Sequence, residues 1–323
     1  MGELDALDQL TVPAPQTGKP LQRLAVTMQL YVAGGHRPEP RRASLAMMLE
    51  AYRLAPGKFQ RWMGTDDDRP RHVHDACPGN IHDAIAPLID RPDRLLSLAL
   101  LECENPPHWQ AWAMLPAENP RHMWLSYATV SVPPSSALRD ADAYVERVLS
   151  WVALLRPQHG TAGFALVDEI GMAHHRRGAA WPWLHRYPGL DCDVFNVQPK
   201  PGCFQSVNWL TVLGEAVLAT LGGRDTVRRR LHDAATELGA TPPTVTAYDT
   251  GALIRASALP MLGDRARGDI PAAYRAVNAA LRPARFENYP DGPNIHLIDA
   301  PRTYDLRQAT LDWVRRFDDQ RLR

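Results

Sequence analysis

Residues 23–32 read RLAVTMQLYV, a mixture of β-branched and aromatic residues that ends before Gly34-Gly35 and predicts a β-strand. Three further apolar segments follow one another along the chain with short, turn-like links: Arg94–Cys103, Trp109–Leu115 and Met123–Val132. Such a series predicts an antiparallel meander. We therefore expect these three segments and Arg23–Val32 to form one four-stranded sheet.

Helical spacing of apolar residues is found on both sides of this meander. Ser44–Leu54 is one predicted helix, with Ser44 as its candidate cap and Pro56-Gly57 as its stop. Asp140–Leu155 has the clearest amphipathic pattern, and one face of it carries Tyr144, Val148, Trp151, Val152 and Leu155. In contrast, residues 64–93 are rich in Gly, Pro, Asp and His and predict a long loop region.

The second half of the chain starts near Pro157 and also mixes strands with helices. The expected strands are Gly163–Val167, Ser206–Leu213 and segments of Thr244–Ala258 around Asp249–Gly251; the expected helices are residues 214–221, Arg224–Leu238, Pro271–Leu281 and Leu306–Phe317. A sheet that packs one face against helices is an α+β arrangement. We therefore predict an α+β fold with antiparallel sheet or sheets flanked by helices.

The predicted organisation has three parts. Residues 1–20 form a flexible or strap-like arm, residues 21–156 an N-terminal half and residues 157–323 a C-terminal half. Two similar lobes remain open as an arrangement, although no residue-level repeat supports them. Since no linker separates the halves, we expect one compact body.

Composition excludes several classes of protein. The 323 residues are 45% hydrophobic and 22% charged, which is ordinary for a globular chain and unlike collagenous, mostly disordered or disulfide-scaffold proteins. Lys+Arg and Asp+Glu number 36 each, so we expect neither a nucleic-acid nor a membrane partner. Arginine dominates the basic residues, with Lys19, Lys58 and Lys200 as the lysines, and we attribute this to codon usage in a GC-rich genome.

The N-terminal residues and the cysteines bear on location. MGELDALDQL shows no charged segment followed by an apolar one, so no secretion signal is visible. Four cysteines without CxxC spacing fit thiols of a reducing compartment. We expect a cytoplasmic protein of unknown oligomeric state.

Strong catalytic and phosphate-binding signatures are missing from the sequence, among them GxGxxG, GxxxxGK[ST], GxSxG and HExxH. One group of potential zinc ligands lies in the predicted loop region: Asp66, Asp67, Asp68, His72, His74, Asp75, Cys77, His82 and Asp83. Their spacing matches no zinc pattern, and a polar surface loop explains them equally well. We expect no bound metal and no cofactor.

Asp168-Glu169 and His174-His175 are the next candidates for chemistry. Adjacent carboxylates on an extended segment point to opposite faces, so they do not form an acid–base pair. His159 precedes Gly160 without any nucleophile signature, and we interpret it as a turn residue or a hydrogen-bonded structural group. We therefore assign no catalytic residue.

A series of phrases in the second half resembles a known family. They are, in chain order, Pro157–Gly163 (PQHGTAG), Arg186–Asp191 (RYPGLD), Val207–Gly214 (VNWLTVLG), Leu221–Gly223 (LGG), Leu259–Asp264 (LPMLGD) and Trp313–Asp318 (WVRRFD). In this order they resemble the TsiV-like family of type VI secretion immunity proteins, which are encoded beside secreted toxins. The resemblance covers residues 156–318 well and 23–54 more loosely. Ala256-Ser257-Ala258 departs from the glycine-containing turn of the family, so the loop shape there is open.

The resemblance implies an antitoxin without catalysis of its own. Such a protein binds and blocks a cognate effector encoded nearby, often a nuclease-type toxin, either at the toxin's active site or from a distance. Two alternatives remain open: a hydrolase that reverses the toxin's damage with the histidines and carboxylates of residues 159–175, and an adaptor of the secretion machine. An inhibitor forms a complex with its toxin, whereas an enzyme protects without one.

The toxin-contacting residues should lie outside the recognisable phrases. These phrases contain turn residues such as Pro188-Gly189 and Gly263-Asp264, which hold a fold, whereas specificity requires surfaces that differ between related pairs. Charged residues beside aromatic ones are typical of tight interfaces. We therefore predict toxin-binding residues in two places, the loop region 64–93 and a rim after residue 180: Asp66, Asp67, Asp68, His72, His74, Trp181, Trp183 and Arg186.

Overall fold

The computed structural model describes residues 2–14, 17–65, 67, 71–72, 77–118, 125–168, 173–192, 201–289 and 304–318. In this part of the chain the strands are β1 (Thr11–Pro13), β2 (Pro20–Val32), β3 (Arg61–Gly64), β4 (Arg71–His72), β5 (Leu96–Leu101), β6 (Gln110–Leu115), β7 (Ser126–Val132), β8 (His159–Val167), β9 (Asp191–Cys192), β10 (Leu210–Gly214), β11 (Thr244–Tyr248) and β12 (Gly251–Arg255). The helices are α1 (Glu3–Leu7), α2 (Pro38–Leu54), α3 (Cys77–Ile89), α4 (Pro134–Leu138), α5 (Ala141–Leu155), α6 (Ala173–Arg186), α7 (Glu215–Thr220), α8 (Arg224–Glu237), α9 (Ala272–Leu281) and α10 (Leu306–Val314), with 3₁₀ turns η1 (Arg265–Arg267) and η2 (Arg282–Ala284).

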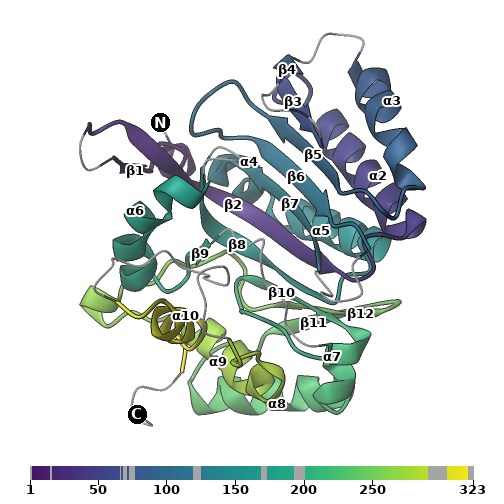
Figure 1. The fold of residues 1–323 in the computed structure, drawn as a ribbon. Coiled ribbons are helices and arrows are strands. Elements are labelled where there is room, and N and C mark those ends of the chain that lie inside the picture. The colour runs from purple at the N-terminus through teal and green to yellow at the C-terminus, as the bar shows by residue number, and fades with distance from the viewer. Residues whose placement is uncertain are drawn as a thin grey trace.

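All of these strands belong to one sheet (Figure 1). Its order is β11-β12-β10-β8-β2-β7-β6-β5-β3-β4, with β1 paired to β2 and β9 paired in parallel to β8. The predicted meander and its pairing with residues 23–32 are confirmed, and so is the α+β class. Because β2 lies between β7 and β8, the sheet continues across residue 157, where we divide the chain. That division stays a prediction.

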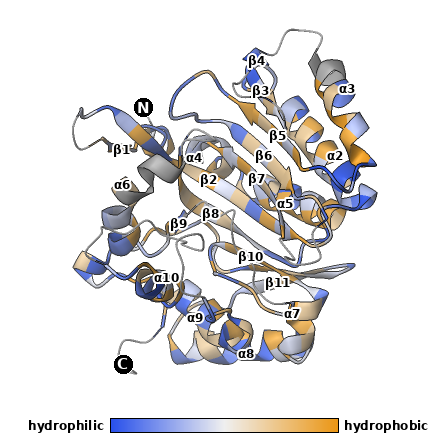
Figure 2. Cartoon of the chain, in the orientation of Figure 1, coloured by the Kyte–Doolittle hydropathy of each residue, from blue (hydrophilic) through white to orange (hydrophobic). Residues whose placement is uncertain are grey.

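Strand β2 carries different residues on its two faces, because side chains alternate along a strand. Leu24, Val26, Met28 and Leu30 belong to the main hydrophobic core. Helices α2 and α3 pack against the meander strands on this side, and α5 contacts β2 (Figure 1). Figure 2 shows hydrophobic and hydrophilic residues on α2, α8 and α9, as expected for helices that bury one face.

The opposite face of the central strands carries a chain of rings. Trp112 of β6, Tyr127 of β7, Tyr31 of β2 and His159 of β8 follow one another with centroid separations of 5.6, 5.6 and 4.5 Å. His159 is therefore a buried strand residue stacked on Tyr31, and the turn interpretation of this histidine was wrong. Burial lowers the pKa of His159 from 6.5 to about 3.

The prediction of a loop region over residues 64–93 was wrong for α3. Within this helix Ile81, Ile85 and Ile89 are buried at intervals of four residues and face the core. Pro87 lies inside the helix, and the Gly and Pro content of this stretch concealed the helical period.

The start of α2 also differs from the prediction. The helix begins at Pro38, a favoured first-turn residue, and Ser44 is buried in its interior instead of capping it. The end at Leu54 is confirmed. Helix α5 agrees closely with its prediction. The Asp140 side chain caps it by accepting a hydrogen bond from the Ala143 N–H at 3.0 Å.

The N-terminal arm lies against the body of the fold. Strand β1 pairs with β2, and the carboxylate of Asp8 accepts hydrogen bonds from the Ser135 backbone N–H at 2.9 Å and from its hydroxyl at 2.5 Å. Asp5 adds an ion pair with Arg139 at 2.7 Å. The arm thus connects the start of the chain to α4, which leads into α5.

Arg41 is fully buried and joins α2 to the chain between α3 and β5. Its guanidinium donates to the backbone oxygens of Gly35 at 2.9 Å, Leu88 at 2.5 Å, and Arg91 and Arg94 at 2.6 Å each. A single cation therefore joins the chain before α2 to the end of α3 and the turn that follows it, where the Leu88 and Arg91 oxygens also accept backbone hydrogen bonds.

Replacing this buried cation tests its structural role. We expect Arg41→Ala to lower the free energy of unfolding by about 3–5 kcal/mol, because it removes a fully buried side chain and four hydrogen bonds that join α2 to the chain around the end of α3. The neighbouring Arg42, exposed and paired with Asp90, is the control, and Arg42→Ala should cost no more than about 0.5 kcal/mol. Urea unfolding measures both, and equal effects would contradict the assignment.

His159 makes stability depend on pH. Its folded pKa of about 3 lies below the unfolded value of 6.5, so its contribution is complete above pH 6.5 and declines as the pH falls toward 3. Between pH 7 and pH 5, this histidine should lower the free energy of unfolding by about 2 kcal/mol. We expect this decrease to be absent in His159→Phe, which keeps a ring against Tyr31. Unfolding curves of both proteins at these two pH values give this difference, and parallel pH profiles would refute it.

Candidate functional site

The first predicted contact region lies at the β3–β4 edge of the sheet. Asp67 accepts a hydrogen bond from the Gly64 N–H at 2.8 Å and pairs with Arg71, and its side chain is largely buried. His72 is exposed on β4. Asp66, Asp68 and His74 lie outside the described residues. The carboxylate of Asp67 thus stabilises its own turn, and its contact role stays a prediction.

The second predicted region is the C-terminal part of α6. Trp183 is exposed and stacks on Tyr187 at 5.9 Å. Trp181 is half-buried and packs against Tyr304 with a centroid separation of 5.3 Å. Arg186 makes a two-point ion pair with Asp264, at 3.0 and 2.7 Å, and so connects α6 to the turn before η1.

The structure does not bring the two predicted regions together. Strand β4 is an edge strand of the sheet, whereas α6 packs against β1, β2 and η1 (Figure 1). The two regions would therefore contact different parts of a partner. Of the two, the region on α6 has more of its predicted residues within the described chain.

A hollow of about 110 Å³ lies between α6 and α10, and we name it the α6–α10 hollow. It is lined by Trp181, Leu184, His185, Arg265, Ala309, Asp312, Trp313, Arg315, Arg316 and Asp318. The sequence analysis identified Trp181 but missed the others, because they come from three separate segments. The half-buried Trp181 of its lining packs against Tyr304, which is exposed.

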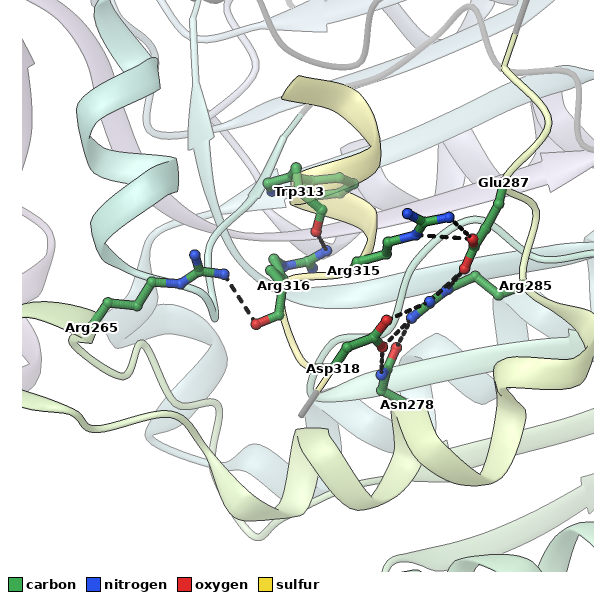
Figure 3. Close-up of polar contacts among 8 residues, drawn as sticks. All are labelled: Arg265, Asn278, Arg285, Glu287, Trp313, Arg315, Arg316 and Asp318. Carbon is green, nitrogen blue, oxygen red and sulfur yellow. Dashed lines mark hydrogen bonds and ion pairs between the residues drawn. The ribbon is translucent and has the colours of Figure 1, made fainter. Parts of the chain in front are cut away.

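A network of charged residues holds the C-terminal side of this hollow in place (Figure 3). The fully buried guanidinium of Arg285 donates to both oxygens of Asp318, at 2.6 and 2.8 Å, and to Glu287 at 2.5 and 2.8 Å. Arg315 pairs with the second oxygen of Glu287. Asn278 donates to Asp318 at 2.7 Å. The segment after α10 is thereby fixed to α9 and to the chain after η2.

Arg316 anchors the same segment to the centre of the fold. It donates to the Pro188 oxygen at 2.8 Å, and to the Ser206 hydroxyl and the Val207 oxygen at 3.0 Å each. Its guanidinium also lies 3.9 Å from the ring centroid of Trp313. Three of the recognisable phrases, Arg186–Asp191, Val207–Gly214 and Trp313–Asp318, therefore meet at this residue.

The carboxylates of the network have lowered pKa values. Burial alone would raise the pKa of Asp318, but hydrogen bonds from Arg285 and Asn278 outweigh it and lower that pKa below 3.8. Burial would likewise raise the pKa of Glu287, but hydrogen bonds from Arg315 and Arg285 outweigh it and lower that pKa. At neutral pH the network is therefore fully charged.

Removing one charge of this network should destabilise the protein. We expect Asp318→Asn to lower the free energy of unfolding at pH 7 by about 2–4 kcal/mol, because Arg285 stays buried with one partner fewer. Since the Asp318 pKa is lowered, this deficit should shrink as the pH falls through that pKa. Asp233→Asn on the exposed face of α8 is the control. Unfolding in urea at pH 7 and pH 3 measures the effect, and a pH-independent deficit would contradict it.

The structure gives little support to chemistry in residues 159–175. His159 is buried in the sheet, and Asp168 is buried at the end of β8. Glu169 and the side chains of His174 and His175 lie outside the described part. Where side chains are described, no group of three or more His, Cys, Asp or Glu residues is placed to hold a metal ion. Within the same part of the chain, no helix has the length and apolar character to cross a membrane.

Comparison with known proteins identifies a family model and solved structures that resemble this chain. A family model described as TsiV, type VI immunity for VRR-NUC, matches residues 46–317. The solved structure of the Pseudomonas aeruginosa T6SS protein PA0821 superimposes with a TM-score of 0.78, covering 97% of this chain and 88% of that one at 21% identity. No curated protein matches. At this identity, the structural likeness shows a common fold.

Proposed function

Because the chain belongs to the TsiV family of type VI immunity proteins, we propose that it neutralises a VRR-NUC nuclease effector by direct protein–protein contact. The family match over residues 46–317 carries this proposal, and it confirms the resemblance expected from the phrases of the second half. The fold shared with a T6SS protein agrees with it. A nuclease threatens the DNA of the cell, so we place the protein in the cytoplasm.

We propose that protection needs no catalysis by this chain. His159, the one histidine of the hydrolase alternative whose side chain is described, is 2% exposed and stacks on Tyr31. Its lowered pKa makes it a weak base, and its burial keeps the ring from direct contact with a substrate. These properties suit a core residue better than a general base.

We propose α6 as the centre of the contact with the effector. Trp183 is 37% exposed although a tryptophan is usually withdrawn from water, and Arg186 lies one turn away beside Tyr187. Tryptophan, tyrosine and arginine are the residues that most often supply binding energy at protein interfaces. The predicted contact through Asp67 and His72 would then belong to a second, separate surface.

Complex formation is the first test. The chain and the effector encoded beside its gene should co-purify at fixed stoichiometry, and calorimetry should give tight binding. Protection of cells without any complex would refute the proposal and favour an enzyme. A block of secretion on deletion, with no loss of protection, would favour an adaptor.

The contact surface is tested by a matched pair of variants. We expect Trp183→Ala to weaken binding by about 2 kcal/mol or more, as expected for an anchor residue. Leu154→Ala on α5 removes an apolar side chain of similar exposure, 40%, and should leave the affinity unchanged. Calorimetry with the purified effector measures both. Equal affinities for the two variants would exclude α6 as the centre of the contact.

A further inference from the structure

One of the residues that line the α6–α10 hollow carries an unpaired hydrogen-bond donor. Trp313 is 4% exposed, and its indole Nε1–H has no hydrogen-bond partner in the part of the chain that the structure describes. Buried polar groups in folded proteins are almost always paired, so an unpaired donor on a residue that lines a hollow is available to an acceptor that enters the hollow. An indole N–H donates and never accepts, which restricts the partner to an acceptor atom.

The charges around this hollow favour an anion. Among the described residues of the hollow and the network next to it, four guanidiniums (Arg265, Arg285, Arg315 and Arg316) accompany three carboxylates (Glu287, Asp312 and Asp318). Four positive and three negative charges leave a surplus of one positive charge. The hollow is thus complementary to a single negative charge.

From this donor, this charge and this volume, we propose that the α6–α10 hollow binds the carboxylate of one aspartate or glutamate side chain of the effector. The proposal rests on the proposed function and names the chemistry of the contact. The Trp313 N–H donates to the incoming oxygen, and Arg265 and Arg315 supply the surrounding positive potential. Trp181, which lines the hollow, and Tyr304, which packs against Trp181, would reduce the access of water to the pair, as the surroundings of interface anchors commonly do.

A protein side chain fits this hollow better than nucleic acid does. A volume of about 110 Å³ is sufficient for a side chain of a few atoms. Asp312 and Asp264 lie beside the arginines and would repel a run of phosphates. The chain as a whole carries no net charge, so no broad electropositive surface extends from the hollow.

The indole N–H is tested with Trp313→Phe, which keeps an aromatic ring but removes the donor. We expect the affinity for the purified effector to fall about tenfold or more, the usual effect of a hydrogen bond to a charged group. In the unaltered protein, the Trp313 indole proton should move downfield in the NMR spectrum when the effector binds. An unchanged affinity together with an unmoved resonance would overturn the proposal.

The charge preference is tested with a second variant that leaves the core intact. His185 is exposed at the hollow, and we expect His185→Glu to weaken binding about tenfold, most strongly at low salt. His232→Glu makes the same change on the exposed part of α8 and is the control. Thermal melts confirm that both variants are folded. Equal losses for the two would overturn the proposal.

These experiments distinguish a failure of the proposed carboxylate site from a failure of the proposed function. If the unaltered protein forms no complex with the effector, the proposed function fails as well. If it forms a tight complex that Trp313→Phe and His185→Glu leave unaffected, the function stands and the carboxylate pocket is wrong. Binding of double-stranded DNA that Trp313→Phe weakens would also overturn the pocket, since its ligand would then be a phosphate.

Discussion

Buried guanidinium groups hold the segments around the proposed contact surface in place. Arg316 donates to the backbone oxygen of nearby Trp313 and to two backbone oxygens and a hydroxyl from distant parts of the chain, and Arg285 binds two carboxylates. A planar cation with five donors can satisfy several acceptors at once, which lysine cannot do. Without these residues the chain after α10 would have no fixed position, and the α6–α10 hollow would lose one of its walls.

The local pattern of the sequence was sufficient for much of the fold. The alternation in Arg23–Val32 and in the three meander segments gave the correct sheet pairing, and the amphipathic stripe of Asp140–Leu155 gave α5. Both signals depend on residues close together in the chain. Helix α3 was not predicted, because its regularly spaced buried isoleucines lie among Gly, Pro and Asp residues that usually indicate loops.

The candidate site was harder to predict because its parts are far apart in sequence. The contacts of its charged network join residues about thirty positions apart, namely Arg285, Glu287, Arg315 and Asp318. No short sequence motif contains them. We attributed the arginine content to codon usage, yet Arg41, Arg285 and Arg316 each have a defined structural role. Trp181, Trp183 and Arg186 were identified because aromatic and basic residues occur together locally.

The position of β2 in the middle of the sheet has a consequence for synthesis. One neighbour of this strand, β8, leaves the ribosome more than a hundred residues later, so the central pairing forms late and folding is slow. A nascent chain thus offers no protection until most of it has been translated. The neutralisation that we propose therefore depends on molecules that were completed before the effector arrives.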